Sequence, residues 1–336
     1  MKKIAIEEHF TTRAYQEALR SRKGFPRIEA VDDENGRKVD RLLRTPFSSQ
    51  PVSAQQTARL LDLGEGRLAE MDRDGIDMQV LMLAGPTVEE LDLPGAAALA
   101  RDINDELAAA VKKHPARLAG FASLAYEDPQ GAARELERAM KLGLKGAKIN
   151  SHVKGEYLDQ KKYWPLWEAA EQLGAPIYIH PKEPPEPLSA LLGYPSLSGA
   201  MWGFMADTSL HALRLMCGGV FDEFPRLRII LGHLGEGLPF WMWRMDNRWT
   251  KRRHKTPQRK PGDYLLANFW VTTSGMFGQE AFDCVYRVLG PERILFAVDS
   301  PYESSEEGVK FIEQADIPAN DKARICHLNA EKLLAL

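Results

Sequence analysis

The sequence predicts a single (β/α)8 TIM barrel, an α/β fold with long inserted loops at its C-terminal face. Short apolar runs alternate along the chain with longer segments of helical periodicity, which is typical of repeated βα units and a parallel sheet. Runs such as "RIILG" and "QVLMLA" are apolar throughout, as expected of strands buried on both faces. Eight such runs are present, and this number favours a closed barrel over an open, doubly wound sheet.

The expected strands are short runs rich in aliphatic residues. They lie at Lys3–Glu8, Met78–Ala84, Leu118–Leu124, Gly146–Asn150, Pro176–His180, Leu227–Gly232, Phe269–Thr273 and Ile294–Val298. The expected helices lie at Gly95–Lys113, Pro129–Leu142, Tyr163–Leu173, Thr208–Cys217, Glu280–Leu289 and Asn320–Leu334. Several of these helices end directly before a glycine, such as Gly143 or Gly174, and glycine commonly terminates helices.

Three stretches interrupt the alternation of strands and helices. The polar segment Arg20–Gln56 is expected to leave the barrel after the first strand and to sit over the mouth of the pocket. A segment rich in Pro and Gly, near 183–207, follows the fifth strand, and the basic stretch "RWTKRRHKTPQRKPGD" is expected to be a solvated loop. Long loops after strands hold the active site of a barrel. Because none of these stretches resembles a linker, one domain is expected over residues 1–336.

Composition argues against several classes of protein. The 336 residues carry 44 basic and 47 acidic side chains, and a net charge of -3 gives no reason to expect nucleic acid or a membrane as partner. The sequence has no apolar run of about 18 residues, so no transmembrane helix is expected. Cys217, Cys284 and Cys326 are too far apart for a disulfide framework, and they favour a reducing cytoplasm. Neither a GxGxxG motif nor a P-loop indicates a nucleotide site.

Polar and titratable side chains follow the predicted strands, where a barrel carries its catalytic groups. They are Glu7, Glu8 and His9 after the first strand, Lys148, Asn150 and His152 after the fourth, His180 after the fifth, His233 and Glu236 after the sixth, and Asp299 and Glu303 after the eighth. A single His180 would more often be a core histidine, and Asp299 before a Ser-Pro pair could cap the next turn. The coincidence of such residues at these strand ends favours a functional site.

Strand alternation separates the acidic cluster "EEHF". Side chains alternate between faces, so Glu7 and His9 point one way and Glu8 points the other way. If the first pair faces the barrel mouth, Glu8 is a structural partner, although a register shift of one residue would exchange the two glutamates. With a His and an Asp from other strands, the pair supplies two carboxylates and two imidazoles, which suit Zn²⁺, Mn²⁺ or Fe²⁺. Composition alone does not choose among these metals.

His233 and Glu236 are three residues apart near the opening of a helix expected after the sixth strand. That spacing brings both side chains to one helix face, where they would form a proton-transfer pair. Glu236 in the first helical turn could equally be a cap, and the two roles are compatible. The role of Lys148 stays open: it could bridge two metals as a carbamate, pair with a glutamate or anchor an anionic substrate.

Several longer stretches resemble the motifs of one enzyme family. "IAIEEHF", "IYIHPKEP", "IILGHLGEGLPFWMWRMDNR", "TTSGMFG" and "ILFAVDSPYE" are similar to motifs of the metal-dependent decarboxylases of the amidohydrolase superfamily that act on dihydroxybenzoates. The resemblance spans the chain from the first strand to the eighth. "GHLGEGLPFW" is its most specific motif, followed by E-x-H in place of the H-x-H of the hydrolases.

The resemblance implies a barrel with one divalent metal ion per subunit, Mn²⁺ or Zn²⁺, with Mg²⁺ as a further candidate. The ligands that it implies are Glu7, His9, His180 and Asp299. The implied reaction is the nonoxidative, reversible decarboxylation of an ortho-hydroxylated aromatic carboxylate. In this reaction Asp299 would protonate the ring carbon, and His233 with Glu236 would handle the neighbouring protons.

The resemblance also implies a homodimer or a homotetramer. Arg244, within "WMWRMDNR", falls where the family has a basic residue near the substrate. Such a residue can contact the substrate of a neighbouring subunit. The aromatic stretch Leu238–Trp243 suits an interface and core packing equally well. The individual loops at Arg20–Gln56 and 183–207 leave the ring substituents of the substrate undetermined.

Two other functions fit the same residues. A mononuclear hydrolase would use the metal to activate water against a lactone or an amide, but E-x-H in place of H-x-H argues against it. A non-catalytic barrel that binds a metal or an aromatic ligand would not need the pair of His233 and Glu236. Metal analysis together with a panel of hydroxybenzoates would separate the three functions.

Overall fold

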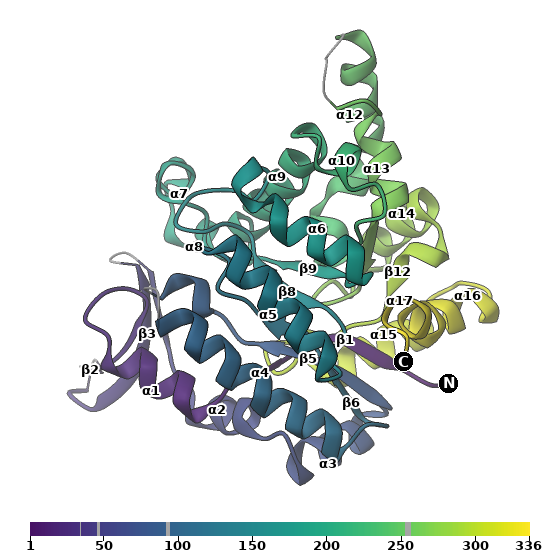
Figure 1. Cartoon of the computed structure of the whole chain (residues 1–336). Coiled ribbons are helices and arrows are strands. Elements are labelled where there is room, and N and C mark those ends of the chain that lie inside the picture. The colour runs from purple at the N-terminus through teal and green to yellow at the C-terminus, as the bar shows by residue number, and fades with distance from the viewer. Residues whose placement is uncertain (34, 46–47, 92–94, 253–256) are drawn as a thin grey trace.

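Parallel strands form the centre of the structure, a computed structural model that describes residues 1–33, 35–45, 48–91, 95–252 and 257–336 (Figure 1). The strands are β1 (Ile4–Phe10), β5 (Met78–Leu83), β6 (Leu118–Gly120), β7 (Ala122–Ser123), β8 (Ala147–Asn150), β9 (Ile177–His180), β10 (Ile229–Leu231), β11 (Phe269–Thr272) and β12 (Ile294–Leu295). They pair in the orders β1-β5-β6 and β7-β8-β9-β10-β11-β12. Because β6 and β7 are two parts of one predicted strand, the described residues contain the eight strands that the sequence predicts.

The ring of strands closes between the two ends of the chain. The backbone N–H of Ile6 donates to the carbonyl of Phe296 at 3.1 Å, and that of His9 donates to the carbonyl of Ser300 at 2.8 Å. The third strand joins the two runs, since β6 pairs with β5 and β7 pairs with β8. The predicted (β/α)8 barrel is therefore confirmed.

Helices surround the barrel. In the described residues they are α2 (Ala54–Leu61), α3 (Glu65–Asp74), η1 (Val88–Glu90), α4 (Gly95–Lys113), α5 (Pro129–Lys141), η2 (Lys161–Tyr163), α6 (Trp164–Leu173), α9 (Gly203–Cys217), α10 (Val220–Glu223), α12 (Leu238–Lys251), α13 (Pro261–Asn268), α14 (Gln279–Leu289), η3 (Pro291–Arg293), α15 (Ser305–Gln314), α16 (Ala319–Ala323), η4 (Arg324–Leu328) and α17 (Asn329–Leu334). None of them is long and apolar enough to cross a membrane.

The structure agrees with most of the predicted helices and adds others. Helix α4 begins and ends at the predicted residues, whereas the helix predicted at Asn320–Leu334 is interrupted by η4, a π-helical turn. Helices α2, α3, α13 and α15 have no counterpart among the predictions, whereas α12 lies where a helix is expected after the sixth strand. The start of α15 could have been found, because the hydroxyl of Ser304 caps it by accepting from the N–H of Glu307 at 3.3 Å.

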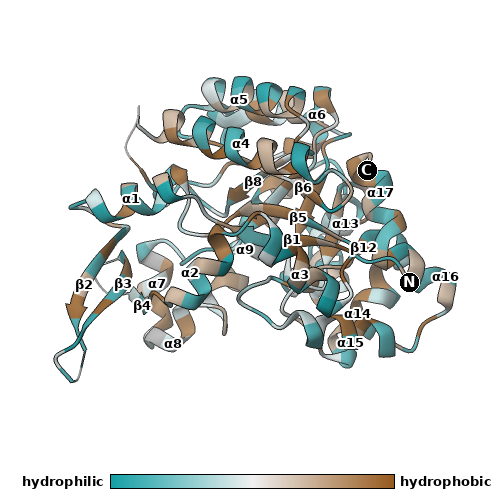
Figure 2. Cartoon of the chain, turned by 90° about the horizontal axis from the view of Figure 1, so that it is seen from below, coloured by the Kyte–Doolittle hydropathy of each residue, from teal (hydrophilic) through white to brown (hydrophobic). Residues whose placement is uncertain are grey.

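The barrel strands are buried on both faces, as their apolar sequences predict. Every residue of β1 and β5 is buried. In Figure 2 both strands lie at the centre of the molecule and are mainly brown, whereas the surrounding helices carry teal residues on their outer faces. The buried polar residues on β1 therefore stand out, because a fully buried carboxylate needs a partner to offset its desolvation.

The N-terminal excursion contains a small antiparallel sheet that the sequence does not reveal. After α1 (Arg13–Ser21), the strands β2 (Arg27–Asp32), β3 (Lys38–Thr45) and β4 (Ser48–Pro51) pair in the order β2-β3-β4. Ile28 and Leu42 are its buried residues, and the rest are partly or fully exposed. The sequences of these strands therefore lack the alternation of apolar and polar residues by which a strand is recognised.

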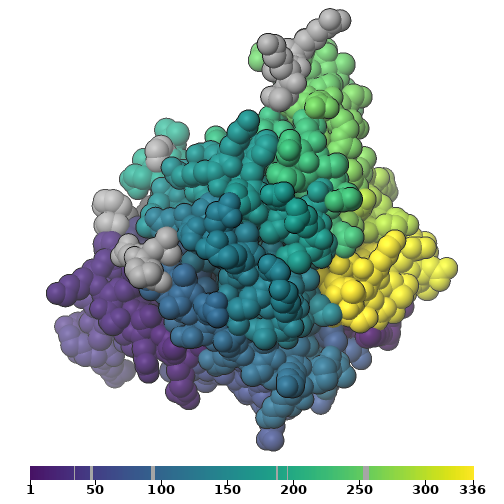
Figure 3. Space-filling model, viewed as in Figure 1, coloured from purple at the N-terminus to yellow at the C-terminus, as the bar shows by residue number. Residues whose placement is uncertain are grey.

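Helices also lie within the segment after β9 and at both ends of the basic segment. Two short helices, α7 (Glu186–Leu192) and α8 (Pro195–Ser198), follow β9. The basic stretch 248–263 begins in the last turn of α12 and ends in α13, and its described residues between the helices, 252 and 257–260, are non-helical and mostly exposed, as expected of a solvated loop. Residues 253–256 lie outside the described part of the chain. Helix α12 projects from the body of the molecule, and Figure 3 shows its green surface standing clear.

A buried arginine ties the start of the barrel to its helices. Arg67 on α3 donates from Nη1 to Oε1 of Gln79 and from Nη2 to the carbonyl of His9, both at 2.9 Å. It also donates to the carbonyls of Asp62 at 2.6 Å and Arg59 at 3.1 Å. This planar fork of donors holds β1, β5 and α2 together, and the three donors of a lysine point in other directions.

Replacing Arg67 by lysine should lower the free energy of unfolding by about 2–4 kcal/mol, because several buried acceptors lose their donors. Urea denaturation followed by circular dichroism measures this change. Arg73→Lys is the matched control: Arg73 lies on the same helix, its side chain is 65% exposed, and its replacement should change stability by less than about 0.5 kcal/mol. Equal effects of the two substitutions would contradict the tethering role of Arg67.

Candidate metal centre and active site

A cavity of about 950 Å³ opens at the carboxyl ends of the barrel strands. His180 at the end of β9 and Asp299 after β12 line it, together with residues of the two insertions such as Arg44 and Tyr194. The N-terminal excursion thus borders this pocket, where the sequence analysis expects it.

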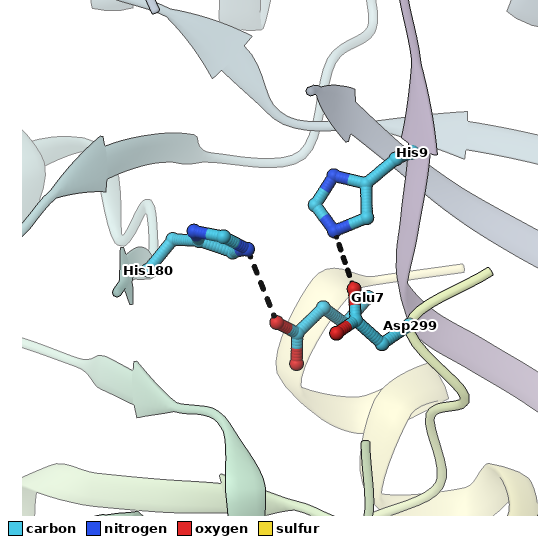
Figure 4. A group of neighbouring side chains, drawn as sticks. All are labelled: Glu7, His9, His180 and Asp299. Carbon is cyan, nitrogen blue, oxygen red and sulfur yellow. Dashed lines mark hydrogen bonds and ion pairs between the residues drawn. The ribbon is translucent and has the colours of Figure 1, made fainter. Parts of the chain in front are cut away.

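Four side chains from three places in the barrel point toward one another (Figure 4), and two of them, His180 and Asp299, line the cavity. Glu7 and His9 come from β1, His180 from β9 and Asp299 from the segment after β12, and their ligand atoms all lie within 4.8 Å of one another. Nε2 of His9 is 2.8 Å from Oδ1 of Asp299, and Nε2 of His180 is 3.5 Å from Oε1 of Glu7. The structure therefore brings together the four residues predicted as ligands.

The carboxylate of Glu7 is fully buried, and its two oxygens differ in their surroundings. Oε2 accepts hydrogen bonds from the hydroxyls of Tyr178, Thr272 and Ser274. Oε1 has no hydrogen-bond partner among the described residues. Burial raises the pKa of Glu7 above its usual value, so the charged form needs a cation beside Oε1. A divalent ion held by the four residues would supply that charge.

The histidines of the group are suited to metal binding. Nδ1 of His180 donates to the carbonyl of Pro181 at 2.8 Å, which selects the tautomer with a lone pair on Nε2. Burial, assisted by the nearby charge of Lys148, lowers the pKa of His180 well below its usual value, so the ring is neutral as a ligand must be. The rings of His9 and His180 meet edge to face with centroids 5.0 Å apart. The donor set therefore fits a divalent ion.

Glu8 faces the opposite side of β1, as strand alternation predicts. Its carboxylate accepts from the backbone N–H groups of Val298 at 3.0 Å and Ser300 at 3.1 Å. Burial raises the pKa of Glu8 to about 8, against the effect of these hydrogen bonds. Glu8 thereby joins β1 to the segment that carries Asp299. It stabilises the position of Asp299 without facing the four-residue group.

Lys148 lies beside the group without belonging to it. Its Nζ is buried and donates to the carbonyl of Leu83 at 3.0 Å. Burial lowers the pKa of Lys148 to about 8, while the charges of Glu89 and Glu7 act in the opposite direction. The possible ligand group formed by His, Asp and Glu side chains of the described residues is Glu7, His9, His180 and Asp299, and the buried amine of Lys148 lies beside it.

His233 and Glu236 form the hydrogen-bonded pair that their spacing predicts, but through a different backbone conformation. Nδ1 of His233 is 2.8 Å from Oε1 of Glu236, and its Nε2 is 3.7 Å from Oδ2 of Asp299. The short segment α11 (His233–Glu236) is not a regular helix, because φ is +49° at His233, +55° at Leu234 and +53° at Glu236. The pair is therefore predicted correctly, whereas the helical geometry expected for it is wrong.

Tight packing beneath the site holds this left-handed turn, which L-residues adopt at an energetic cost. A β carbon at Gly232 would lie 2.9 Å from the hydroxyl of Tyr178 and 3.1 Å from Oε2 of Glu7, so only glycine lets the chain pass there. The backbone N–H of His233 then donates to Oγ of Ser274 at 3.2 Å. The turn directs the imidazole toward the four-residue group.

The charges around His233 favour a protonated imidazole next to an ionised Asp299. Burial by itself disfavours charge on His233, but the carboxylates of Glu236 and Glu7 outweigh it and raise the pKa of His233 well above its usual value. Burial likewise disfavours charge on Asp299, but the nearby imidazole of His233 and the hydrogen bond with His9 hold the pKa of Asp299 below its usual value. The arrangement therefore favours a proton on His233, whose Nε2 lies 3.7 Å from Oδ2 of Asp299.

Comparison with known protein families matches residues 44–336 of the chain to the amidohydrolase family. The chain belongs to this family. The family resemblance predicted from the sequence motifs is thereby confirmed. This amidohydrolase is 39% identical over 346 aligned positions to the γ-resorcylate decarboxylase of Polaromonas sp. (strain JS666), with 99% of this chain and 98% of the relative covered.

Two solved structures resemble this amidohydrolase along the whole chain. The 5-carboxyvanillate decarboxylase of Sphingomonas paucimobilis matches with a TM-score of 0.88 at 35% identity, and the match covers 100% of this chain and 99% of that one. The dihydroxybenzoic acid decarboxylase of Polaromonas sp. JS666, with bound manganese and the inhibitor 2-nitroresorcinol, matches with a TM-score of 0.84 at 37% identity. That match covers 100% of this chain and 97% of the other.

Arg244 lies apart from the pocket of its own chain. It is an exposed residue of α12 and is not among the residues that line the cavity. A contact with substrate inside one subunit is therefore not supported, and the predicted contact requires the arginine of one subunit to reach the pocket of another.

The structure adds polar residues to the pocket that the sequence analysis does not single out. Lys182, Glu90 and Arg44 line the cavity, and Nε of Arg44 lies 3.1 Å from Oε1 of Glu183. Lys182 could have been found by alternation, since it follows the predicted ligand His180 by two residues. Glu90 and Arg44 carry no local signal, because they reach the pocket from a 3₁₀ turn and from the polar sheet.

Proposed function

We propose that this amidohydrolase is a metal-dependent decarboxylase that removes CO₂ from an ortho-hydroxylated aromatic carboxylate by a reversible, nonoxidative reaction. The observation that carries the proposal is the contact between the pair of His233 and Glu236 and the four-residue group at the strand ends. The imidazole of His233, held by Glu236, lies 3.7 Å from Asp299, which belongs to the possible ligand group. A group that only binds a ligand has no need of a proton store at this place, and the relatives with this fold are named decarboxylases.

The metal of the proposed enzyme is one Mn²⁺ or Zn²⁺ ion per subunit, held by Glu7, His9, His180 and Asp299. Two carboxylates favour Mn²⁺ and two imidazoles favour Zn²⁺. The manganese in the Polaromonas relative supports the first choice. When bound, the ion supplies Lewis acidity toward the carboxylate and the neighbouring phenolate oxygen of the substrate.

The difficult step is protonation of the ring carbon that bears the carboxylate, because it interrupts aromaticity. Asp299 is the proposed proton donor, since it lines the cavity and contacts His233. The ring carbon takes the proton, the bond to the carboxylate breaks, and its electron pair returns to the ring as CO₂ leaves. Because Asp299 is ionised beside His233, the proton that it donates comes first from His233, which takes up a proton from solvent after CO₂ has left. Glu236 keeps the imidazole oriented for this transfer.

A substrate panel tests the proposal. Metal-loaded protein should release CO₂ from 2-hydroxybenzoates, with loss of the aromatic-acid absorbance, and should leave lactones and amides intact. Hydrolysis of a lactone or an amide without CO₂ release would replace the proposal by a hydrolase. Metal binding without turnover of any of these compounds would indicate a binding protein.

Metal removal is expected to abolish turnover reversibly. Protein treated with dipicolinate should lose CO₂ release because the two substrate oxygens lose their electrophile, and Mn²⁺ or Zn²⁺ should restore it. Metal content and rate are measured on the same samples. Protein dialysed without chelator is the control, and full activity in a sample free of metal would contradict the metal dependence.

We further propose that the active form is a homodimer or homotetramer in the cytoplasm. Aromatic side chains on α12 are highly exposed, with Phe240 at 75%, Trp241 at 56% and Trp243 at 73%. Burying them against another subunit would bring Arg244 of the same helix to an interface, where it could contact the substrate of the neighbour. The free cysteines Cys217, Cys284 and Cys326 support a reducing compartment.

A further inference from the structure

A second layer of polar side chains lies beyond the four-residue group, on two neighbouring strands. Asn150 at the end of β8 pairs in register with His180 at the end of β9. Two residues further along each chain, His152 and Lys182 also line the cavity. Pro181 restricts the chain between His180 and Lys182 to extended conformations, so Lys182 follows His180 at a rise of about 6–7 Å. That rise is comparable to the width of a benzene ring with a substituent.

Lys182 is held in place by two partners. Its Nζ forms an ion pair with Oε1 of Glu90, whose side chain is 20% exposed, and donates to the carbonyl of His152 at 3.1 Å. Glu90 belongs to η1, the 3₁₀ turn after β5, so the pair spans the cavity wall between β5 and β9. Both side chains line the cavity. The pair is therefore a fixed part of the pocket.

The hydrogen-bonding capacity of the pair is only partly used. An ammonium has three N–H donors, and Glu90 and His152 take two of them. No further acceptor for Lys182 lies among the described residues, and none of them donates to Oε2 of Glu90. The pair thus presents one donor and one acceptor side by side, and a hydroxyl group satisfies both.

Charge selects the hydroxyl over other substituents. The ion pair of Lys182 with Glu90 is neutral overall, and the neighbouring cation Arg44 is paired with Glu183. A second carboxylate on the ring would meet the oxygens of two glutamates without an uncompensated cation. A methoxy group would accept from Lys182 but has no proton for Glu90. The upper part of the pocket therefore matches a neutral hydroxyl.

We propose that Lys182 and Glu90 bind a ring hydroxyl at C4 or C5 of the substrate, on the side away from the carboxylate and ortho-hydroxyl edge. This inference rests on the proposed function, because that edge must lie at the four-residue group for the opposite edge to reach the pair. The substrate class is then a dihydroxybenzoate with its second hydroxyl at C4 or C5. A monohydroxybenzoate leaves the third donor of the buried Lys182 and the free oxygen of the half-buried Glu90 without a ligand partner, which a site built around a hydroxyl penalises.

Turnover of a series of benzoates tests the assignment. Dihydroxybenzoates with hydroxyls at C2 and C4, or at C2 and C5, should be turned over with a kcat/KM about tenfold or more above the value for salicylate, because charged partners strengthen hydrogen bonds. Neither the 4-methoxy derivative of salicylate nor 4-hydroxyisophthalate, which carries a second carboxylate, should show this gain. In Lys182→Met and in Glu90→Gln the preference should fall to within about threefold. Lys141→Met, at an exposed lysine of α5, is the matched control and should keep the full preference.

Binding of unreactive analogues provides a readout that does not depend on turnover. In 4-nitroresorcinol and 2-nitrophenol a nitro group replaces the carboxylate, and only the first has the additional hydroxyl. Calorimetry on metal-loaded protein should give a lower Kd for 4-nitroresorcinol, and the difference should shrink in both variants. Circular dichroism and metal content show that the variants are folded and loaded.

The outcomes separate the two proposals. Equal kcat/KM values and equal Kd values in the unmodified protein would overturn the assignment of Lys182 and Glu90 while leaving the decarboxylase intact. A preference that persists in both variants would overturn it as well. Absence of turnover for every benzoate would contradict the proposed function instead, and the ratio of the two Kd values would then decide whether the pair recognises a hydroxyl.

Discussion

Replacing His233 by asparagine should leave the metal content of the protein unchanged and lower kcat by about 10²–10⁴-fold. Asparagine can keep a hydrogen bond toward Glu236, which lies 2.8 Å from Nδ1 of His233 in the structure. It cannot carry the proton that Nε2 would deliver to Asp299 across 3.7 Å. The loss should therefore fall on kcat, because the step removed is proton transfer and not substrate binding.

Metal analysis and steady-state kinetics on the same preparation measure this effect. His327→Asn is the matched control, since His327 lies on η4 and pairs with Glu331 away from the cavity. Glu236→Gln should show a smaller decrease in kcat, because it keeps a hydrogen bond but removes the charge that raises the pKa of His233. Normal turnover in His233→Asn would reduce the pair to a structural element.

Replacing His180 by alanine should remove both the metal and the activity. The substitution deletes one of four ligands, the one whose Nε2 lies 3.5 Å from Oε1 of Glu7. Loss of an outer hydrogen bond to a metal ligand already lowers affinity by about 10–100-fold, so loss of the ligand itself should exceed that. A calorimetric titration of the metal-free, chelator-treated protein with Mn²⁺ gives the metal affinity, and CO₂ release gives the activity.

His114→Ala provides the comparison for this experiment. His114 precedes β6 and lies at the amino ends of the strands, opposite the cavity. Its removal should change neither the manganese affinity nor kcat. A His180→Ala protein that is free of metal and fully active would reject the ligand assignment, whichever substrate is used.

The positions of the ligand group follow from local sequence patterns. Strand alternation separates Glu7 and His9 from Glu8, and the structure places Glu8 against the backbone of Val298 on the other face. His180 and Asp299 were recognisable because each follows a buried apolar run. The positions of these side chains are predictable because a parallel barrel strand is buried along its length, so its period of two and its end are visible in the sequence, while their role as ligands stays a prediction.

Other features could not be predicted because their causes lie far apart in the chain. The sheet β2-β3-β4 has no apolar alternation, since its residues are mostly exposed. The pair of His233 and Glu236 depends on a left-handed turn, which is stabilised by Tyr178 and Glu7 packing against Gly232. A regular helix would bring residues at the same spacing together. The spacing therefore predicted the contact between His233 and Glu236 but the wrong backbone conformation.

Burial along short segments makes three features predictable from the sequence: the barrel, the order of its strands and the side chains at the strand ends. The remote residues that complete the pocket are visible only in the folded structure. Lys182 and Glu90 meet only because the turn after β5 lies beside the chain after β9. Arg244 is outside its own pocket because α12 projects from the barrel. Such contacts depend on how loops pack in three dimensions, and the periodicity of apolar residues along the sequence does not reveal this packing.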